Sequence, residues 1–455
     1  NQHPLYFLRT LLWRTKCDNL EKRLKNPRKN YMLATRLSER LQRSGIHYGW
    51  VMAVLAFFTT VFSSASFSMP HVLIIPITEE FDWNISDVTT PISLMFLTLA
   101  AMAPFGSALM LRFGVAKVVG ITGVFIAFGL ICTTQIFLKW HLFISIGIFL
   151  GVAAGMIGLG LTATIATRWF TTRRGLVVGI LTSGFAAGQL SFVPLAAWLA
   201  ANYDWRVAVL PALIGSGICA ISFLLLGKDW PSEVSLPPLG ETEVNQPPAP
   251  TQQNPIHISF SCLIDAARTP IFWMLTLTFF ICGLSSTGIV GQHFIPFCSD
   301  NSVGAVVAAS YLALMGIFNF LGTLGSGWLS DRFNNYNLLA TYYGLRGLSL
   351  IWLPYSDFDV FSLTLWAIFF GLDFIATVPP TVRLAGNFFG PIKGPIAFGW
   401  IFASHQLGSA VAAFAAGETR DSVLTYLPAF VAAGVSCFVA VLLIMPFRRY
   451  RLGTE

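Results

Sequence analysis

Three ionisable residues occur inside segments that are otherwise apolar enough to cross a membrane. Asp373 lies within Leu363–Pro380, Arg346 within residues 337–354, and His405 within residues 395–417. A charge at bilayer depth is costly, so such residues usually pair with one another or mark the path of a transported solute. A carboxylate can carry a proton, a guanidinium binds anions without losing its own proton, and an imidazole changes charge near neutral pH. These residue types indicate a site that binds or moves a small charged solute together with protons.

The three residues also fall at a similar depth. At about 1.5 Å per helical residue, Arg346 and Asp373 lie roughly 13 Å from the inner ends of their segments, and His405 roughly 15 Å. They therefore meet near the middle of the membrane, where alternating-access transporters bind their ligands. Two structural alternatives remain open. Asp373 could be part of an ion pair or a protonated acid that only joins helices, and His405 a neutral ring bonded to Gln406 or a helix carbonyl.

The elements that must position these residues are membrane-spanning helices. The chain of 455 residues is 55% hydrophobic and 11% charged, against about 25% charged in soluble domains. We therefore predict an all-α, multi-pass integral membrane protein of the cell (inner or plasma) membrane. Twelve spans are predicted, at about 48–76, 88–111, 117–138, 142–167, 175–201, 206–227, 270–296, 303–329, 337–354, 360–382, 395–417 and 423–446.

The basic residues define the orientation of these spans. Residues 1–44 hold eleven of the 28 Lys and Arg residues, and the rest of the chain is nearly neutral. With the N-terminus inside, the loops between spans obey the positive-inside rule, and the acidic loops lie outside. Both termini are therefore expected in the cytoplasm. A basic stretch beside a span attracts anionic membrane lipid, and nothing in it indicates nucleic acid. The tail is expected to be solvated and to have no specific function; a second interpretation is that the natural chain starts at Met32.

A long polar linker divides the spans six and six. We predict a tail at 1–46, a first bundle at 47–227, a linker at 228–268, a second bundle at 269–449 and a short tail at 450–455. The part of the linker from Trp230 to Pro255 is rich in Pro, Glu, Gln and Asn, so we expect it not to fold. His257–Arg268 is predicted to form an amphipathic helix on the membrane.

Two motifs recur about 220 residues apart, at matching places in the two bundles. Trp169–Gly175, after the fourth span, corresponds to Phe388–Gly394 after the tenth. Arg112–Gly114, after the second span, corresponds to Asp331–Phe333 after the eighth. Such a repeat predicts two six-helix bundles related as parallel repeats.

The residues give no indication of enzymatic chemistry. The sequence has no GxxxxGK[ST] phosphate loop, no GxGxxG turn after a strand, and no HExxH or paired Cys/His spacing, so no nucleotide cofactor and no metal is expected. Its seven cysteines show no CxxC spacing and mostly lie in apolar segments, which favours buried thiols without a role. The chain is therefore not expected to be an enzyme.

From these motifs the chain resembles the major facilitator superfamily. The loop signature Gly-x-x-x-Asp-Arg-x-Gly-[Arg/Lys] is present in the second half as Gly327-Trp-Leu-Ser-Asp331-Arg332-Phe, whereas Leu111 occupies the Asp position in the first half. The resemblance implies two bundles related by pseudo-two-fold symmetry. It also implies a cavity bordered by the seventh, tenth and eleventh spans, with the ninth outside, which makes Arg346 the expected partner of Asp373. The residues expected to gate the cytoplasmic mouth are Asp331, Arg332, Arg112, Arg173 and Arg174.

Within that superfamily, Trp169-Phe-x-x-Arg-Arg-Gly and His47-Tyr-Gly-Trp50 resemble the monocarboxylate and oxalate/formate transporter group. We therefore expect a secondary transporter of a small organic anion, a mono- or dicarboxylate, coupled to protons or to anion exchange. His405 would carry the proton, and Asp373 with Arg346 would shape the cavity. Gln406 and Gln189 would donate neutral hydrogen bonds, and His293 would lie near the outer gate. Two alternatives are efflux of an amphipathic compound or siderophore, with Trp273, Phe279 and Phe280 as a cavity wall, and a non-transporting sensor.

Overall fold

The computed structural model describes residues 29–244 and 253–449, and throughout that part the chain is helical, with two isolated β-bridges. Ten helical stretches are long and apolar enough to cross a membrane. One of them, Val360–Arg420, holds both the tenth and the eleventh span, and α15 (Asn335–Trp352) supplies the ninth. The twelve predicted spans are therefore confirmed.

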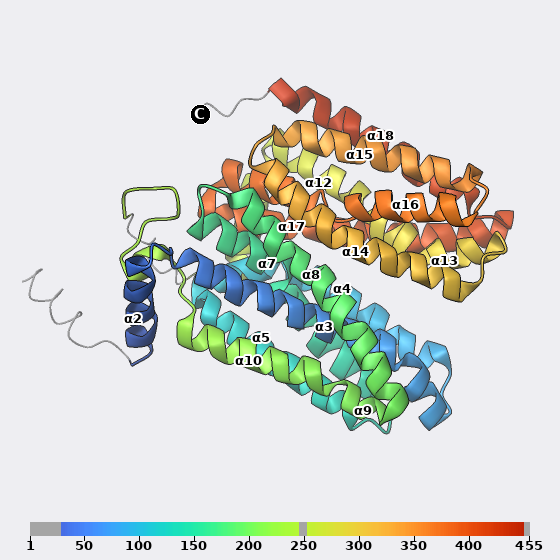
Figure 1. Cartoon of the computed structure of the whole chain (residues 1–455), viewed down its shortest axis with the longest axis horizontal. Helices are drawn as coiled ribbons and strands as arrows, with labels where there is room; N and C mark the ends of the chain where they lie inside the picture. Colours follow the sequence, from blue (N-terminus) through green and yellow to red (C-terminus); the bar gives the residue numbers. More distant parts are fainter. Residues whose placement is uncertain (1–28, 245–252, 450–455) are drawn as a thin grey trace, which may run out of the picture.

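The spans form two bundles that lie one above the other in Figure 1. The first half contains α3 (Gly49–Phe81), α4 (Ile85–Phe113), α5 (Val115–Thr134), α6 (Lys139–Leu142) continued by the π-helix η1 (Phe143–Leu150) and α7 (Gly151–Trp169), α8 (Arg174–Asn202), α9 (Trp205–Ala208) and α10 (Leu210–Leu226). The second half contains α12 (Pro270–Gly283) continued by the π-helix η3 (Leu284–Val290) and α13 (Gly291–Asp300), α14 (Ala305–Ser330), α15, α16 (Val360–Asp373), α17 (Val378–Val423) and α18 (Leu427–Ile444).

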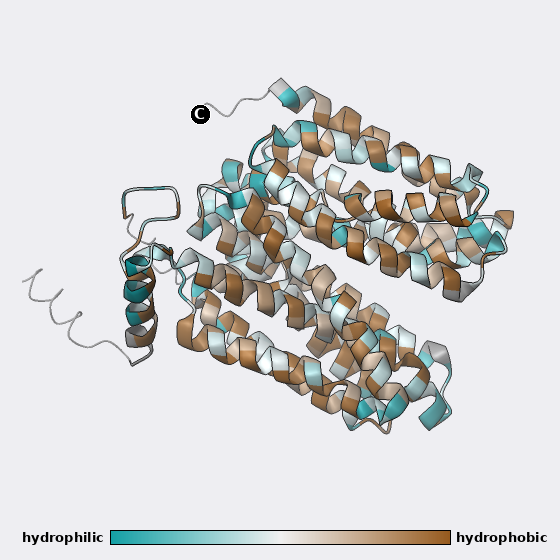
Figure 2. Ribbon diagram, viewed as in Figure 1, coloured by the Kyte–Doolittle hydropathy of each residue, from teal (hydrophilic) through white to brown (hydrophobic). Residues whose placement is uncertain are grey.

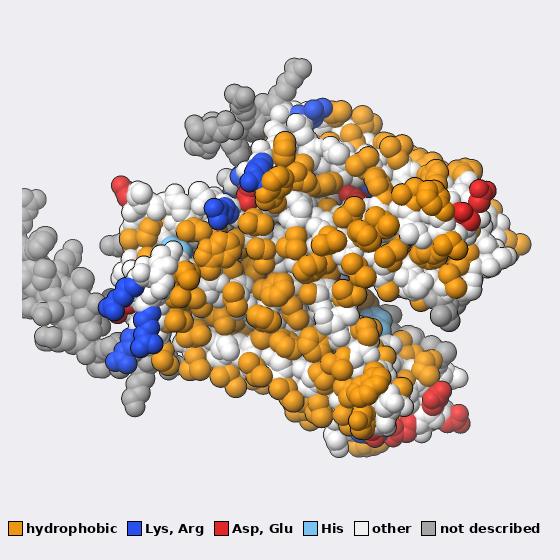
Figure 3. Space-filling view, in the orientation of Figure 1, with side chains coloured by type: hydrophobic (Ala, Val, Ile, Leu, Met, Phe, Trp, Pro, Cys, Tyr) orange, Lys and Arg blue, Asp and Glu red, His pale blue; other side chains and the backbone are white. Residues whose placement is uncertain are grey.

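Charge distinguishes the two ends of the molecule. Apolar side chains cover the middle of both bundles and polar residues gather at their ends (Figure 2). In Figure 3, the visible Lys and Arg residues gather mainly at one end, here called the basic end, and most of the visible Asp and Glu residues lie at the other, here called the acidic end. This distribution is the one that the positive-inside rule predicts for a cytoplasmic basic end.

The halves meet closely at the basic end. A Cβ on Gly175 would lie 2.6 Å from the carbonyl oxygen of Gly327, and one on Gly179 would lie 2.8 Å from that of Thr323. The missing side chains let the backbones of α8 and α14 touch, as small residues do in membrane helices. A Cβ on Gly399 of α17 would lie 2.8 Å from the carbonyl oxygen of Ala103 in α4. The seam, meaning the interface between the two halves, is thus closed along the part nearest the basic end.

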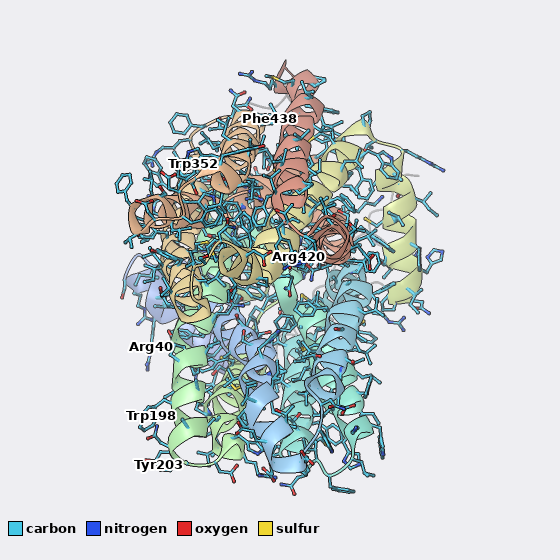
Figure 4. All side chains as sticks on the ribbon, turned by 90° about the vertical axis from the view of Figure 1, so that its right-hand side faces the viewer. Arg40, Trp198, Tyr203, Trp352, Arg420 and Phe438 are labelled. Atoms are coloured by element: carbon cyan, nitrogen blue, oxygen red, sulfur yellow. The ribbon has the colours of Figure 1, made fainter. Side chains whose placement is uncertain are left out.

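At the acidic end the halves separate. Figure 3 shows the surface hollowed between them, and Figure 4 looks onto this end, with Trp198 and Tyr203 on one bundle and Trp352 and Arg420 on the other. Ion pairs here join residues of the same half: Glu80 with Arg206 at 2.6 Å, Asp87 with Lys139 at 2.7 Å, and Asp300 with Arg420 at 2.7 Å. The structure is therefore open at the acidic end and closed at the basic end.

The linker differs from the prediction. Its first part packs on the basic end of the first half, with the short 3₁₀ helix η2 (Pro231–Val234), instead of staying unfolded. Trp230 lies under the Arg168 guanidinium, 4.6 Å from guanidinium carbon to ring centroid. The backbone N–H of Leu239 donates to the Trp169 carbonyl at 2.8 Å. For residues 230–244 the prediction was wrong, because a polar segment needs no core of its own when it can pack on the surface of a folded bundle; residues 245–252 of the predicted segment lie outside the described residues.

The predicted amphipathic helix is present as α11 (Pro255–Ala267), but it packs against protein rather than lying only on the membrane. Its Ser259 hydroxyl donates to the Pro104 carbonyl of α4 at 2.9 Å, and its Asp265 pairs with Lys393 of α17 at 2.6 Å. The helix therefore bridges both halves at the basic end.

Candidate functional site

The centre of the candidate site is a break in the tenth span. α16 ends at Asp373, a turn occupies residues 374–377, and α17 resumes at Val378 with Pro379 and Pro380 directly behind. A proline has no N–H and clashes with the carbonyl four residues earlier, so two in succession prevent a regular helix here. Carbonyl groups are freed at membrane depth, where every polar group needs a partner.

Arg346 of α15 donates hydrogen bonds to the polar groups at this break. Its side chain is fully buried, and its Nε donates to Asp373 Oδ2 at 2.5 Å. Its Nη2 donates to the backbone carbonyls of Asp373 at 2.6 Å and Phe374 at 3.2 Å. The predicted pair is therefore present, and one guanidinium satisfies both a carboxylate and the carbonyls of the break. A planar fork of five N–H donors suits this arrangement.

The other side of the guanidinium faces the seventh span. Its Nη1 donates to the sulfur of Cys282 at 3.1 Å and approaches Ser285 Oγ at 3.5 Å. The second carboxylate oxygen of Asp373, Oδ1, is buried and has no hydrogen-bond partner among the residues that the structure describes. The carboxylate thus keeps one unused acceptor in a buried site.

His405 of α17 is partly exposed and lies between aromatic rings. Its ring centroid is 5.0 Å from that of Phe279 and 5.8 Å from that of Phe402. Its Nδ1 lies 2.9 Å from Oε1 of Gln406. The expected contact with Gln406 is therefore present. Of Arg346, Asp373 and His405, only His405 is not buried.

The remaining predicted binding residues lie apart from this cluster. Gln189 is an exposed residue of α8. His293 of α13 bonds the Ala413 carbonyl at 2.8 Å and lies 3.4 Å from the Tyr426 hydroxyl, so it joins three helices of the second half. The aromatic wall predicted for the efflux alternative is not formed by its three residues together. Trp273 is half exposed and donates to the Ala267 carbonyl, whereas Phe279 is buried against His405.

Asp331 makes the main polar contact between the halves at the basic end. Its carboxylate accepts the backbone N–H groups of Gly175 at 2.7 Å and Leu176 at 2.8 Å, so a residue of α14 caps the first turn of α8. Arg383 of α17 pairs with the same carboxylate at 2.8 Å. Carboxylates at helix N-termini are stabilised by the free N–H groups and the helix dipole.

The other expected gating residues differ in what they contact. Arg174 donates to Asn387 Oδ1 of the other half at 2.8 Å. Arg332 does not brace Asp331, because its guanidinium lies over the Trp328 ring, 3.7 Å from the centroid. Arg112 donates to the Gln253 carbonyl of the linker at 2.9 Å, and Arg173 is exposed.

In the first half, where Leu111 replaces the acid, the linker supplies a carboxylate. Asp229 accepts the backbone N–H of Val115 at 2.5 Å and so caps α5. This cap joins the linker to the first half and does not reach the second. Of these two carboxylates, that of Asp331 is the one that contacts the other half.

Sequence reasoning missed Cys282, Arg383 and Asp229. Cys282 was counted among the buried thiols without a role. Ser285 and Ser286 follow it by three and four residues, so the three side chains share one polar face of the seventh span. Arg383 and Asp229 lie in loops or at helix ends, and only the folded chain brings them to their partners.

Comparisons with known proteins agree with this architecture. Residues 56–413 match the sequence model of the family described as the Major Facilitator Superfamily. Monocarboxylate transporter 13 of Rattus norvegicus is 26% identical over 393 residues, covering 85% of this chain and 86% of that protein. The MFS-type transporter YcxA of Bacillus subtilis is 24% identical over 414 residues, covering 88% and 95%.

Two solved structures share the fold. The proton:xylose symporter XylE superposes with a TM-score of 0.68 at 12% identity, covering 88% of this chain and 96% of that one. The fucose:proton symporter FucP of E. coli gives 0.66 at 14% identity, covering 88% and 99%. The chain belongs to the Major Facilitator Superfamily of membrane transporters.

Proposed function

We propose that this protein is a secondary transporter that moves a small organic anion, a monocarboxylate, together with a proton. The observation that carries the proposal is the midplane cluster. A partly exposed histidine, His405, and a buried Arg346–Asp373 pair lie on helices of one half, and His405 and Arg346 both interact with Cys282. The names of the monocarboxylate transporters that resemble this chain support the choice of substrate class.

Arg346 and His405 have different roles in this proposal because their charges are balanced differently. Arg346 is committed to Asp373 and to the break, so its charge is balanced and it stabilises the shape of the site. His405 is left as the group of this cluster that is not held in an ion pair and whose side chain can exchange a proton. Its imidazolium would attract a carboxylate entering from the acidic end, and loss of the proton would release that anion.

Alternating access would reverse which end is open. In the present state the Asp331 cap and the α8–α14 glycine contacts seal the basic end. Opening that end requires these contacts to separate while the acidic end closes. With the basic end in the cytoplasm, as the charge distribution favours, this structure represents the outward-open state.

Counterflow in proteoliposomes tests the proposed substrate class. Vesicles containing the purified protein are loaded with unlabelled lactate or pyruvate, and uptake of the labelled compound is followed. Acceleration by a small carboxylate, increased by an inward proton gradient, is expected. Acceleration only by lipophilic amphiphiles would support efflux instead. No counterflow, with a cellular response that disappears when residues 1–44 are deleted, would support a sensor.

A further inference from the structure

The thiol of Cys282 contacts three polar side chains. Its sulfur accepts Arg346 Nη1–H at 3.1 Å, lies 3.2 Å from the Thr377 hydroxyl, and interacts with the His405 imidazole. The residue is 2% exposed. A buried cysteine usually behaves as a small apolar side chain. Contact with a guanidinium, a hydroxyl and an imidazole together is a different environment.

Close packing of two helices fixes this arrangement. A Cβ on Gly283, directly after Cys282, would lie 1.9 Å from the carbonyl oxygen of His405. A Cβ on Gly408 would lie 2.1 Å from the carbonyl oxygen of Phe280. The backbones of α12 and α17 therefore touch at this level, which holds the chain positions of Cys282 and His405 close together.

The hydrogen bonds define how charge can pass through the cluster. Nε and Nη2 of Arg346 bind Asp373, and Nη1 binds the sulfur of Cys282. With Nδ1 of His405 donating to the amide oxygen of Gln406, 2.9 Å away, Nε2 of the neutral ring is left as an acceptor. The thiol is thus the contact between the accessible imidazole and the buried ion pair.

We propose that Cys282 is the positioning residue that couples protonation of His405 to the Arg346–Asp373 pair. This inference rests on the proposed proton-linked transport. A proton entering from the acidic end forms one N–H bond at Nε2, and that nitrogen changes from acceptor to donor toward the sulfur. The S–H bond then turns to the Thr377 hydroxyl, and the sulfur accepts from two cations. No electron changes place, and the proton leaves when Nε2 releases it at the other end of the cycle.

The added charge explains why substrate and proton would bind together. With both Arg346 and His405 cationic around one sulfur, the single carboxylate of Asp373 no longer balances the cluster. A substrate carboxylate would restore the balance. The titratable and charged groups facing Cys282 from the helices packed against it are Arg346 and Tyr343 of α15, Asp373 of α16, His405 of α17 and Cys437 of α18.

Transport measurements give the first test, with Cys282→Ala and Cys282→Ser, and with Cys219→Ser as a matched control at a buried thiol of the first half. In Cys282→Ala, the pH midpoint of proton-driven uptake should be displaced by about one pH unit from that of the unmodified protein. Substrate exchange with equal pH on both sides should keep about half of the unmodified rate or more. Cys282→Ser, which keeps a donor and an acceptor, should be displaced less. Equal loss of both transport modes, with an unmoved midpoint, would overturn the proposal.

Infrared spectroscopy gives a second test that needs no substrate. The S–H stretching band of Cys282 is the band that the purified Cys282→Ser variant lacks. This band should shift as the pH is lowered from about 7.5 to about 5.5, around the ordinary histidine pKa. The shift should vanish in His405→Gln. A band that does not respond to pH would overturn the coupling. A responsive band in a protein that transports no monocarboxylate would support the coupling and reject the proposed substrate.

Discussion

At the scale of single residues, Arg346 and Asp373 depend on each other because neither is solvated. Arg346 is fully buried, and the Asp373 side chain is 8% exposed. Replacing both partners by apolar residues is often tolerated in proteins, whereas removing one leaves an uncompensated charge. This asymmetry separates the pair's structural role from its role in transport.

Asp373→Asn is expected to destabilise the protein by about 3–5 kcal/mol, because Arg346 keeps its charge without a carboxylate. The loss is measured as a lower melting temperature of the purified protein. Asp300→Asn breaks the partly exposed pair with Arg420 and serves as the control, with an expected loss of about 0–1 kcal/mol.

The double variant Arg346→Met/Asp373→Leu should recover most of the lost stability, since it buries no charge. If the pair belongs to the transport site, this stable variant should still be inactive in counterflow. Full activity would show that the pair only holds the helices together.

His405→Gln is expected to flatten the pH dependence of uptake between about pH 5.5 and 7.5, the range in which a histidine titrates. Substrate exchange at equal pH should remain, because glutamine keeps a hydrogen-bonding side chain at this position. His293→Gln is the control, since His293 joins helices at the acidic end. An unchanged profile in His405→Gln would remove His405 from the proton path.

At the scale of helices, the Asp331 cap links the start of α8 to the end of α14. A cap within one half stabilises the fold in every state of the cycle. A cap that crosses the seam stabilises only the state in which the basic end is closed. The location of the cap therefore predicts an effect on conformation and not only on stability.

Asp331→Ala should favour opening of the basic end. Loss of an N-cap costs about 1 kcal/mol, which corresponds to about a fivefold change in the ratio of closed to open states. Distances between spin labels on α8 and α14 at the basic end report this ratio. Asn334→Ala removes the cap of α15, which lies inside the second half, so it should lower stability without changing the distances.

The docked linker gives a pH-dependent prediction. Burial, and then the neighbouring Asp229 carboxylate, raise the pKa of Glu233 above its ordinary value. The folded state thus favours the protonated form, and this contribution to stability is lost as the pH rises from the unfolded pKa through the folded one. Glu233→Gln, whose amide oxygen can still accept the N–H groups of Asp229 and Trp230, should raise the melting temperature at pH 7. The gain should vanish below about pH 4.3, and a gain that persists there would contradict this account.

At the scale of the whole molecule, two rigid bundles meet at one end and separate at the other (Figure 1). The polar contacts between them at the basic end involve few residues, and the glycine crossings allow the helices to slide. A change of state therefore requires the bundles to rock about this seam.

A short cross-link between Arg174→Cys and Asn387→Cys, residues that bond across the seam at 2.8 Å, should stop turnover while substrate still binds from the acidic end. Counterflow and ligand binding are measured before and after cross-linking. The same reagent on Glu80→Cys and Arg206→Cys, which pair within the first half, should leave turnover unchanged. Continued turnover with the seam locked would contradict rocking of the two halves.

The sequence by itself determined the membrane-spanning helices, and it indicated Arg346, Asp373 and His405 as the ionisable residues of interest within them. Long apolar segments have one favourable solution in a bilayer, because only a helix satisfies its own backbone there. An ion inside such a segment needs a partner, and the family resemblance, which places the ninth span outside the cavity, made Arg346 the expected partner of Asp373. The sequence resemblance also gave the family, which the comparisons confirmed.

Only the tertiary structure decided which groups touch across helices. The contact of Cys282 with Arg346, the pairing of Arg383 rather than Arg332 with Asp331, and the docking of the linker all join residues far apart in the chain. Hydrophobic patterning fixes the depth of a residue in the membrane, but rotation and sliding of packed helices are set by side-chain and glycine contacts with neighbours. Those contacts exist only once the bundles have assembled, and they also decide that this state is closed at its basic end.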